Sequence, residues 1–260
     1  MNLTIRDLSK SYASRSGNIL ALDSLDLEIN PQEFISIVGP SGCGKSTLLK
    51  IIAGILPPTS GYIDFDDSNT THLLQTDLVF QEHGLFPWLD VVSNVAFGLK
   101  MQGVSKQLRT EKALAFLNKF GLKDFTHVYP YQLSGGMKQR VALARAIVSN
   151  PGMLLMDEPF GALDSQTRML LQEELIKLWR DYRKTVIFVT HDIDEAILLS
   201  DRVLIMSGRP GKIIKQYLVP AEIRRNLSDR FHPMIHDLKK EIWHLIKNEV
   251  QKEIQVELNG

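Results

Sequence analysis

The residues best suited to chemistry form one glycine-rich stretch that follows an apolar run at 34–38. In order they are Gly39, Pro40, Ser41, Gly42, Cys43, Gly44, Lys45, Ser46 and Thr47. The spacing G-x-x-x-x-G-K-S is typical of a phosphate-binding loop, whose backbone N–H groups surround a β-phosphate at the start of a helix. We expect Lys45 to reach the β- and γ-phosphates and the Ser46 hydroxyl to bind Mg²⁺. A glycine-rich turn without a ligand is the alternative, but it explains neither the lysine nor the hydroxyl.

Two adjacent carboxylates, Asp157 and Glu158, follow a second apolar run at 153–156. Hydrolysis of a nucleotide needs one carboxylate to hold Mg²⁺ and another to polarise the attacking water. We therefore predict that Asp157 is a metal ligand and that Glu158 is the catalytic base. A helix N-cap is the alternative role for these acidic residues. His191 closes a further strand-like run and is predicted to hydrogen-bond the γ-phosphate and to orient Glu158.

Three other segments carry groups that suit a nucleotide. Gln81 follows an apolar run, and we expect its amide oxygen to bind a metal ion or a catalytic water. Tyr12 precedes the phosphate loop and would stack on an adenine ring. Ser134, Gly135 and Gly136 open a helix with one hydroxyl and two backbone amides, which predicts a second anion site. Because the phosphate loop encloses one side of a nucleotide, the second site would serve a nucleotide held by another copy; a capping turn is the alternative.

The elements that must position these residues alternate between strands and helices. Residues 3–29 show short alternating apolar patterns with a polar turn at 14–18, which predict a small antiparallel sheet with Tyr12 in its first turn. Later strand patterns are each followed by a helical pattern, which predicts parallel βαβ packing and a layered α/β core. Ligands gather at the carboxyl ends of such strands, where the predicted site residues fall.

We predict a single nucleotide-binding domain over residues 1–260, in three parts. An α/β core with an N-terminal β subdomain occupies 1–85 and 151–220. A helical subdomain that carries Ser134 is inserted at 86–150, and a C-terminal helical extension occupies 221–260. The helical subdomain rests on apolar spacing at 91–100, 105–120 and 134–149.

Two segments each allow two roles. Phe86, Pro87, Trp88 and Leu89 crowd into a predicted loop after Gln81, as either a hinge core or a socket for a partner. An amphipathic pattern over 231–250 uses Phe231, Met234, Ile235, Leu238, Ile242, Leu245 and Ile246. This segment would be a helix packed on the core, serving as core cover or as a dimer or regulatory contact.

Composition narrows the class of protein further. The 30 Lys and Arg balance the 30 Asp and Glu, so the net charge is zero, which argues against a broad footprint for nucleic acid. The apolar runs are far shorter than the roughly 20 residues that span a bilayer, and the first residues lack the features of a secretion signal. The single cysteine, Cys43, fits a reducing cytoplasm and acts either as a small filler or as a thiolate stabilised near a helix N-terminus.

With these motifs in this order, the chain resembles the ATP-binding subunits of ATP-binding cassette transporters over nearly all of its length. By this resemblance, residues 39–47 are the Walker A loop, Gln81 is the Q-loop glutamine and residues 133–140 are the signature motif. Asp157 and Glu158 would be the Walker B aspartate and the catalytic glutamate, and residues 162–164 the D-loop. His191 would be the switch histidine and Tyr12 the adenine-stacking aromatic. The stretches 80–89 and 201–213 resemble the nitrate, sulfonate and taurine importer group.

The resemblance implies an α/β fold with a RecA-like P-loop NTPase core, and an ATPase with ATP and Mg²⁺ as cofactors. It further implies a nucleotide-sandwich homodimer, or a dimer with a paralogous ATPase subunit, at the cytoplasmic face of the cell membrane. Its partners would be transmembrane permease subunits and, indirectly, a solute-binding protein that delivers small anionic or organic solutes.

Three other classes fit less well. A cassette ATPase of DNA repair needs a long coiled-coil insertion, but only about 50 residues separate Gln81 from Ser134. Translation cassettes usually carry two copies in one chain, and a P-loop kinase would not need the second anion site.

Overall fold

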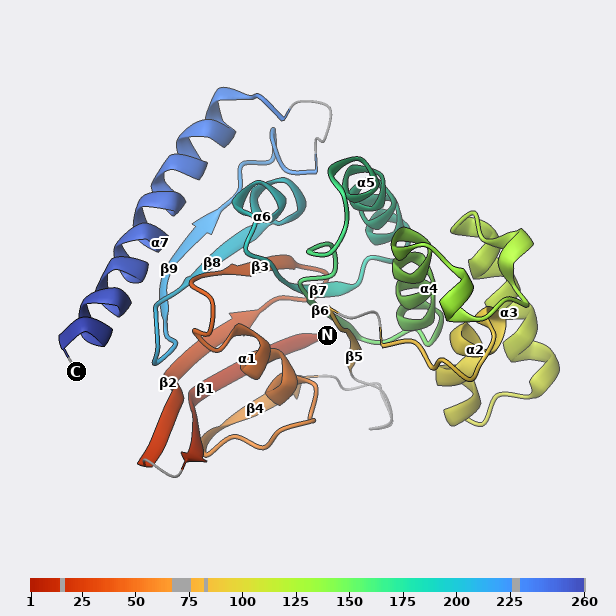
Figure 1. Cartoon of the computed structure of the whole chain (residues 1–260), viewed down its shortest axis with the longest axis horizontal. Coiled ribbons are helices and arrows are strands. Elements are labelled where there is room, and N and C mark those ends of the chain that lie inside the picture. The colour runs from red at the N-terminus through yellow and green to blue at the C-terminus, as the bar shows by residue number, and fades with distance from the viewer. Residues whose placement is uncertain (15–16, 67–75, 82–83, 226–229, 260) are drawn as a thin grey trace. The chain divides into compact units, whose positions relative to one another are not determined.

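The structure is a computed structural model that describes residues 1–14, 17–66, 76–81, 84–225 and 230–259 (Figure 1). The chain forms two compact units, one of Met1–Asn69 with Lys184–Gly260 and the other of Thr70–Arg183. The predicted division at residues 86, 151 and 221 stays a prediction.

Two long antiparallel strands open the first unit. β1 (Asn2–Ser14) pairs on one side with β2 (Gly17–Ile29) and on the other with β4 (Ser60–Asp66). The predicted antiparallel sheet is therefore confirmed. Tyr12, however, lies within β1 opposite Ile19, so its predicted place in a turn is wrong. Residues 15 and 16 of the predicted turn lie outside the described part of the chain.

A second sheet of the first unit delivers the phosphate loop. Its central strand β3 (Phe34–Val38) lies between β7 (Thr185–Val189) and β8 (Arg202–Met206), all parallel. The antiparallel strand β9 (Ile213–Leu218) pairs with β8. Every residue of β3 and β7 is buried, which is typical of parallel strands covered on both faces. Helices α1 (Lys45–Ile52) and α6 (Ile193–Leu199) follow β3 and β7.

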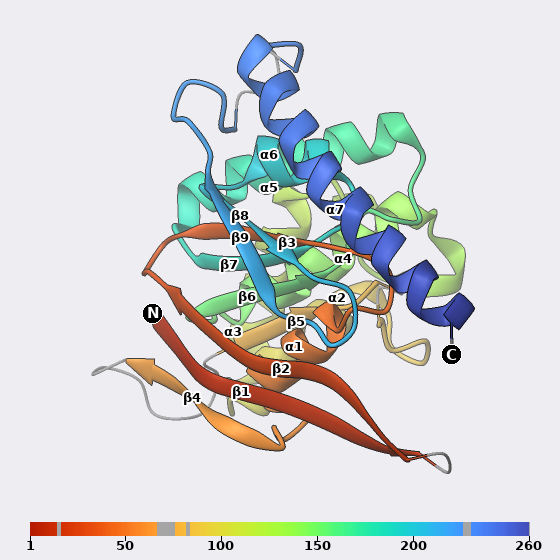
Figure 2. The same cartoon turned by 90° about the vertical axis from the view of Figure 1, so that its left-hand side faces the viewer.

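The long C-terminal helix α7 (Pro233–Asn259) runs beside α6, β8 and β9 (Figures 1 and 2). Ile235 and Ile242 are buried in a cluster with residues of α6 and β8. The amphipathic helix predicted over 231–250 is confirmed, although it begins at Pro233 and continues to Asn259, and its inner face covers the core. Phe231 is 97% exposed and Met234 is 40% exposed, so their predicted place on the inner face is wrong.

The second unit pairs two parallel strands with four helices in its described residues. The strands are β5 (Thr76–Val79) and β6 (Met153–Asp157), and the helices are α2 (Val91–Met101), α3 (Lys106–Lys119), α4 (Gly135–Val148) and α5 (Ser165–Tyr182). Short 3₁₀ turns occur at η1 (Lys123–Phe125) and η2 (Pro130–Gln132).

Each of these four helices begins at a residue that caps it with an oxygen atom, namely Asp90, Ser105, Ser134 and Asp164. The predicted helices at 91–100, 105–120 and 134–149 are confirmed to within one residue at each end. Of the helices within the described ranges, none combines the length and apolar character needed to cross a bilayer.

One carboxylate fixes the start of β3. Asp201 accepts hydrogen bonds from the Phe34 backbone N–H at 2.9 Å, from Arg224 at 2.7 Å and from Arg225 at 3.0 Å. Burial disfavours its charge, but the hydrogen bonds, first of all that of Arg225, outweigh burial and hold the pKa of Asp201 below its ordinary value. Because β3 runs directly into the phosphate loop, this carboxylate helps to set the position of that loop.

We expect Asp201→Asn to lower the free energy of unfolding at pH 7 and to have a smaller effect in acid. The folded-state pKa lies below the unfolded value, so the stabilisation is present above the unfolded pKa and is lost as the pH falls through the folded pKa. Urea unfolding of both proteins at about pH 7 and about pH 3 measures this change. Asp23→Asn, which breaks a more exposed ion pair with Lys212, is the control. An equal loss at both pH values would contradict the role of the charge.

Candidate functional site

The phosphate loop joins β3 to α1 and needs glycine at defined positions. Gly42 and Gly44 have φ values of +79° and +105°, in the left-handed region that side chains disfavour. A Cβ atom on Gly44 would also lie 2.7 Å from Cδ2 of Leu22 and 3.0 Å from the Ala21 carbonyl oxygen. A Cβ atom on Gly39 would lie 2.8 Å from the Met206 carbonyl oxygen. Backbone angle and close packing therefore both favour the glycines of the motif.

The start of α1 is suited to an anion. Gly44 is its N-cap and offers no side chain to cap the helix, so this end presents backbone N–H groups and the positive end of the helix dipole. Lys45 is only 6% exposed, and its ammonium donates hydrogen bonds to the carbonyl oxygens of Gly39 at 2.9 Å and Pro40 at 2.7 Å. The lysine thus folds over its own loop.

Cys43 is fully buried within the loop. Burial raises the pKa of its thiol, although nearby Lys45 opposes the shift. The burial and the raised pKa favour the role of a small filler over that of a stabilised thiolate.

Tyr12 lies against the far end of the phosphate loop. Its hydroxyl is 3.3 Å from Oγ1 of Thr47, and its side chain is 38% exposed. The ammonium of Lys10 lies 5.4 Å from the centre of the tyrosine ring. A partly exposed ring beside the loop has the position that stacking on a base requires, and the stacking itself stays a prediction.

His191 leaves the sheet at the same edge as the phosphate loop. In the parallel pair of β3 and β7, Ile37 lies opposite Val189, and the Thr190 N–H donates to the Ile37 carbonyl oxygen at 3.3 Å. The chain continues from β3 into Gly39 and from β7 into His191, which is exposed. The structure therefore brings these two predicted elements together within the first unit.

Gln81, Asp157 and Glu158 leave the strand pair of the second unit at one edge. Val79 lies opposite Met156 in the parallel pair of β5 and β6, so the residues that follow both strands emerge side by side. Gln81 is exposed, and both carboxylates are half-buried. Residues 82 and 83, which complete the predicted bend after Gln81, lie outside the described part.

The backbone at Glu158 is unusual. Its φ of +45° lies in the left-handed region, and its carbonyl oxygen accepts a hydrogen bond from the Gly161 N–H at 3.1 Å. Such a conformation costs roughly 1–2 kcal/mol for a residue other than glycine and is often found at functional sites. The N-cap of α5 is Asp164, so the alternative of a helix cap for Asp157 and Glu158 is wrong.

The second glycine-rich motif starts α4. The Ser134 hydroxyl oxygen accepts a hydrogen bond from the Met137 N–H at 3.3 Å, so the predicted capping turn is present. Ser134 and Gly135 are nevertheless exposed. A Cβ atom on Gly136 would lie 2.6 Å from Cγ2 of Thr167, which explains this glycine by the close approach of α5. The anion-binding role of the motif stays a prediction.

Sequence reasoning missed the group that shapes the loop after Gln81. Asn94 of α2 is fully buried, accepts from the Phe86 N–H at 2.8 Å and donates to the carbonyl oxygens of Phe86 at 3.1 Å and Leu89 at 2.9 Å. Phe86 packs on Phe97, with ring centres 4.5 Å apart, whereas Trp88 is 70% exposed. A polar residue on the apolar face of the pattern at 91–100 was the signal that could have revealed this anchor.

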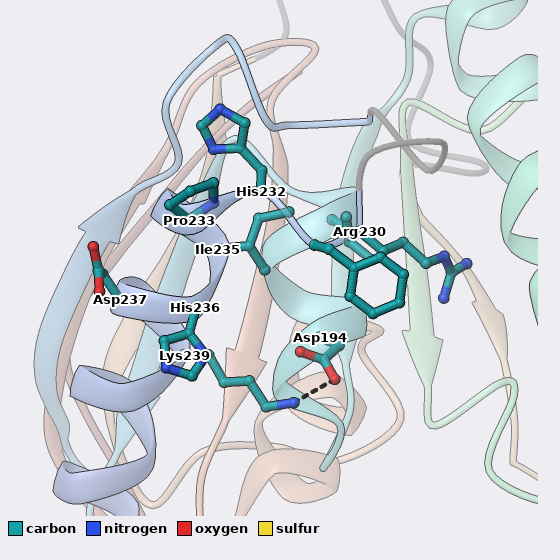
Figure 3. A pocket seen from close by; sticks show the side chains of 10 residues that line it. Asp194, Arg230, His232, Pro233, Ile235, His236, Asp237 and Lys239 are labelled. Carbon is teal, nitrogen blue, oxygen red and sulfur yellow. Dashed lines mark hydrogen bonds and ion pairs between the residues drawn. The ribbon is translucent and has the colours of Figure 1, made fainter.

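Two of the cavities lie apart from the predicted phosphate-binding motifs. One of about 260 Å³ is lined by Trp88, Val92, Phe97 and basic residues of α2 and α3. The other, of about 540 Å³, lies at the start of α7 and is shown in Figure 3. In that cavity basic side chains lie beside carboxylates, as in the 2.6 Å ion pair of Lys239 with Asp194.

Comparisons with known proteins agree with this geometry. Residues 22–161 match the ABC transporter family. The chain is 44% identical over 256 residues to an uncharacterized ABC transporter ATP-binding protein of Methanocaldococcus jannaschii, covering 98% of this chain and 95% of that protein. It is 45% identical over 220 residues to the nitrate import ATP-binding protein NrtD of Synechocystis, covering 84% and 83%. It is 47% identical over 197 residues to the taurine import ATP-binding protein TauB of Yersinia pestis, covering 75% and 77%.

A solved structure gives the same result for the fold. The dimeric post-hydrolysis state of an ATP-binding cassette bound to ADP and Pi has a TM-score of 0.75 and 34% identity, covering 84% of this chain and 99% of that one. The fold and the phosphate loop define a P-loop ATPase, and the predicted fold class is confirmed. The chain belongs to the ABC transporter family, whose ATP-binding subunits hydrolyse ATP to drive transport.

We expect Gly44→Ala to weaken ATP binding and to lower the melting temperature more than Gly54→Ala does. Both glycines have positive φ values, but a Cβ atom at Gly54 would meet nothing within 4 Å. The Gly54 variant therefore reports the cost of the backbone angle alone, roughly 1–2 kcal/mol. Thermal melting and titration with ATP compare the two. Equal melting and equal ATP affinity in both variants would show that packing against Leu22 does not matter.

Proposed function

We propose that this chain binds ATP·Mg²⁺ in a nucleotide-sandwich dimer and energises a membrane importer. The dimer would contain two copies of this chain, or this chain and a paralogous ATPase subunit. The observation that carries the proposal is the pair of helix N-termini in glycine-rich motifs, at α1 and α4, together with a dimeric relative bound to ADP and Pi. In such a dimer Ser134, Gly135 and Gly136 face the nucleotide of the partner copy.

The residues of the phosphate loop perform the binding. The backbone N–H groups of 39–47 surround the β-phosphate, and Lys45 exchanges its carbonyl partners for phosphate oxygens. Tyr12 stacks on the adenine ring. Its hydroxyl contact with Thr47 keeps the ring next to the loop.

A hydroxyl, an amide and a carboxylate would hold the Mg²⁺ ion in this proposal. Ser46, Gln81 and Asp157 offer oxygen ligands, the type that Mg²⁺ prefers, so their chemistry fits this ion. When bound, Mg²⁺ neutralises charge on the phosphates. Glu158 would take a proton from the attacking water as the water oxygen bonds to the γ-phosphorus and the bond to the ADP oxygen breaks. His191 would donate a hydrogen bond to the γ-phosphate and orient Glu158.

The relatives support the direction and class of transport. Nitrate import and taurine import proteins are both similar to this chain over most of its length. We infer an importer of small anionic or organic solutes of the nitrate, sulfonate or taurine type. The subunit would lie peripherally on the cytoplasmic face of the cell membrane, bound to permease subunits that receive solute from a binding protein.

The exposed Trp88 marks the surface for the permease. The residue is 70% exposed beside the cavity of about 260 Å³, while its neighbour Phe86 is packed within the unit. A short helix of a permease subunit would bury the indole ring. Trp88 and Gln81 belong to one segment, so movement at the metal site would reach this surface.

We expect Glu158→Gln to bind ATP but to hydrolyse it about 10² to 10⁴ times more slowly, the usual contribution of a positioned base. ATP should then accumulate in a dimer, which gel filtration with and without ATP can detect. Glu173→Gln, on the exposed side of α5, is the control. Hydrolysis by Glu158→Gln at the wild-type rate would exclude this residue as the base.

We expect Trp88→Ala to weaken copurification with the permease while ATP affinity and melting temperature stay near wild type. A buried interface tryptophan contributes about 2 kcal/mol or more, and the exposed ring contributes little to the isolated subunit. Tyr131→Ala removes another exposed aromatic side chain, 76% exposed, as the control. Normal assembly and transport by Trp88→Ala would overturn the proposed contact. A large drop in melting temperature would instead assign the ring to the core.

A further inference from the structure

The sequence assigned no chemical role to the loop between β8 and β9. The loop lies in the stretch 201–213, which resembles one group of importers. Residues 207–212 form a closed turn, in which the Ser207 N–H donates to the Lys212 carbonyl oxygen and the Lys212 N–H donates to the Ser207 hydroxyl, both at 2.9 Å. The Gly211 N–H donates to the Ala21 carbonyl oxygen of β2 at 2.9 Å. The two ends of the loop are therefore fixed to each other, and its β9 end is fixed to β2.

This loop contacts backbone carbonyl groups of the phosphate loop. Nη2 of Arg209 donates a hydrogen bond to the Gly42 carbonyl oxygen at 3.2 Å. A Cβ atom on Gly211 would collide with the Cys43 carbonyl oxygen, so the two backbones are in direct contact. A phosphate loop uses its N–H groups for the ligand. Arg209 therefore binds the loop without competing for the phosphate.

The C-terminal helix holds the other side of the same loop. The Glu253 carboxylate accepts from the Arg209 backbone N–H at 2.8 Å, and the Glu249 carboxylate accepts from the Gly208 N–H at 3.2 Å. These carboxylates lie four residues apart on one face of α7. A Cβ atom on Gly208 would lie 2.5 Å from Oε1 of Glu253, so the Glu253 side chain lies directly against the loop backbone.

We propose that Arg209 is a positioning residue for ATP and that α7 acts on the phosphate loop through it. The inference rests on the proposed ATP site and adds a role for the C-terminal helix. Glu249 and Glu253 fix the backbone of 208–209, and Arg209 fixes the carbonyl side of Gly42. The guanidinium also brings a positive charge close to the loop that receives a triphosphate. Release of α7 from the loop would loosen the phosphate loop and lower ATP affinity.

The test measures ATP affinity and steady-state hydrolysis of the full chain. We expect Arg209→Ala and Glu253→Ala each to raise the Kd and KM for ATP about three- to tenfold, with kcat within about twofold, because each loses one charge-assisted hydrogen bond. The double variant should bind ATP no more weakly than whichever single variant binds it more weakly, since both side chains belong to one chain of contacts. Arg209→Lys, which keeps a cationic donor, should restore affinity to within about twofold of wild type.

Asp237→Ala is the matched control, because it removes an exposed carboxylate from the first turns of the same helix. Unchanged ATP affinity in either single variant, effects that multiply in the double variant, or failure of Arg209→Lys to restore binding would each overturn the inference. Wild type and Asp237→Ala must bind and hydrolyse ATP for the comparison. If they do not, the proposed function fails, and with it the inference.

Discussion

The turn from β3 into α1 is the constraint on which the proposed nucleotide chemistry depends. Its glycines at 42 and 44 adopt left-handed backbone angles, and Gly44 packs so closely on β2 that a side chain would collide with Leu22. The same turn begins α1 at a glycine, which has no side chain to cap the helix. Tight packing on the outside of the loop and backbone donors on its inside are therefore two consequences of one backbone path.

Parallel strands explain how distant motifs reach comparable positions. In the first unit β3 and β7 end together, so Gly39 and His191 start from one edge. In the second unit β5 and β6 end together, so Gln81 follows one strand at the edge where Asp157 ends the other. Neighbouring parallel strands require only matched ends to gather residues that lie far apart in the sequence. The arrangement is the same in both units, although different residues use it.

The sequence predicted most of what depends on residue type and period. Helical spacing located α2, α3 and α4 almost to the residue, because apolar faces and capping residues mark both body and ends. It placed Tyr12 in a turn instead of in β1, because the end of a strand and a turn both have polar, partly exposed residues. Nor did it separate Phe86 from Trp88, since the path of that loop depends on hydrogen bonds with Asn94, and a polar residue on an apolar helix face does not by itself name its partners.

The contacts of Arg209 show why supporting residues escape pattern analysis. The phosphate loop has a fixed spacing because its own backbone meets the ligand, whereas its support can come from any element that reaches the Gly42 carbonyl. Here that support comes from a loop 167 residues away in sequence, itself held by a helix near the chain end. The strained backbone of Glu158 also depends on its surroundings, since a φ of +45° at a residue other than glycine persists only where the surrounding structure enforces it. At Glu158 the carbonyl oxygen accepts a hydrogen bond from the Gly161 N–H, which closes the turn after β6, so the backbone there depends on residues that follow the strand.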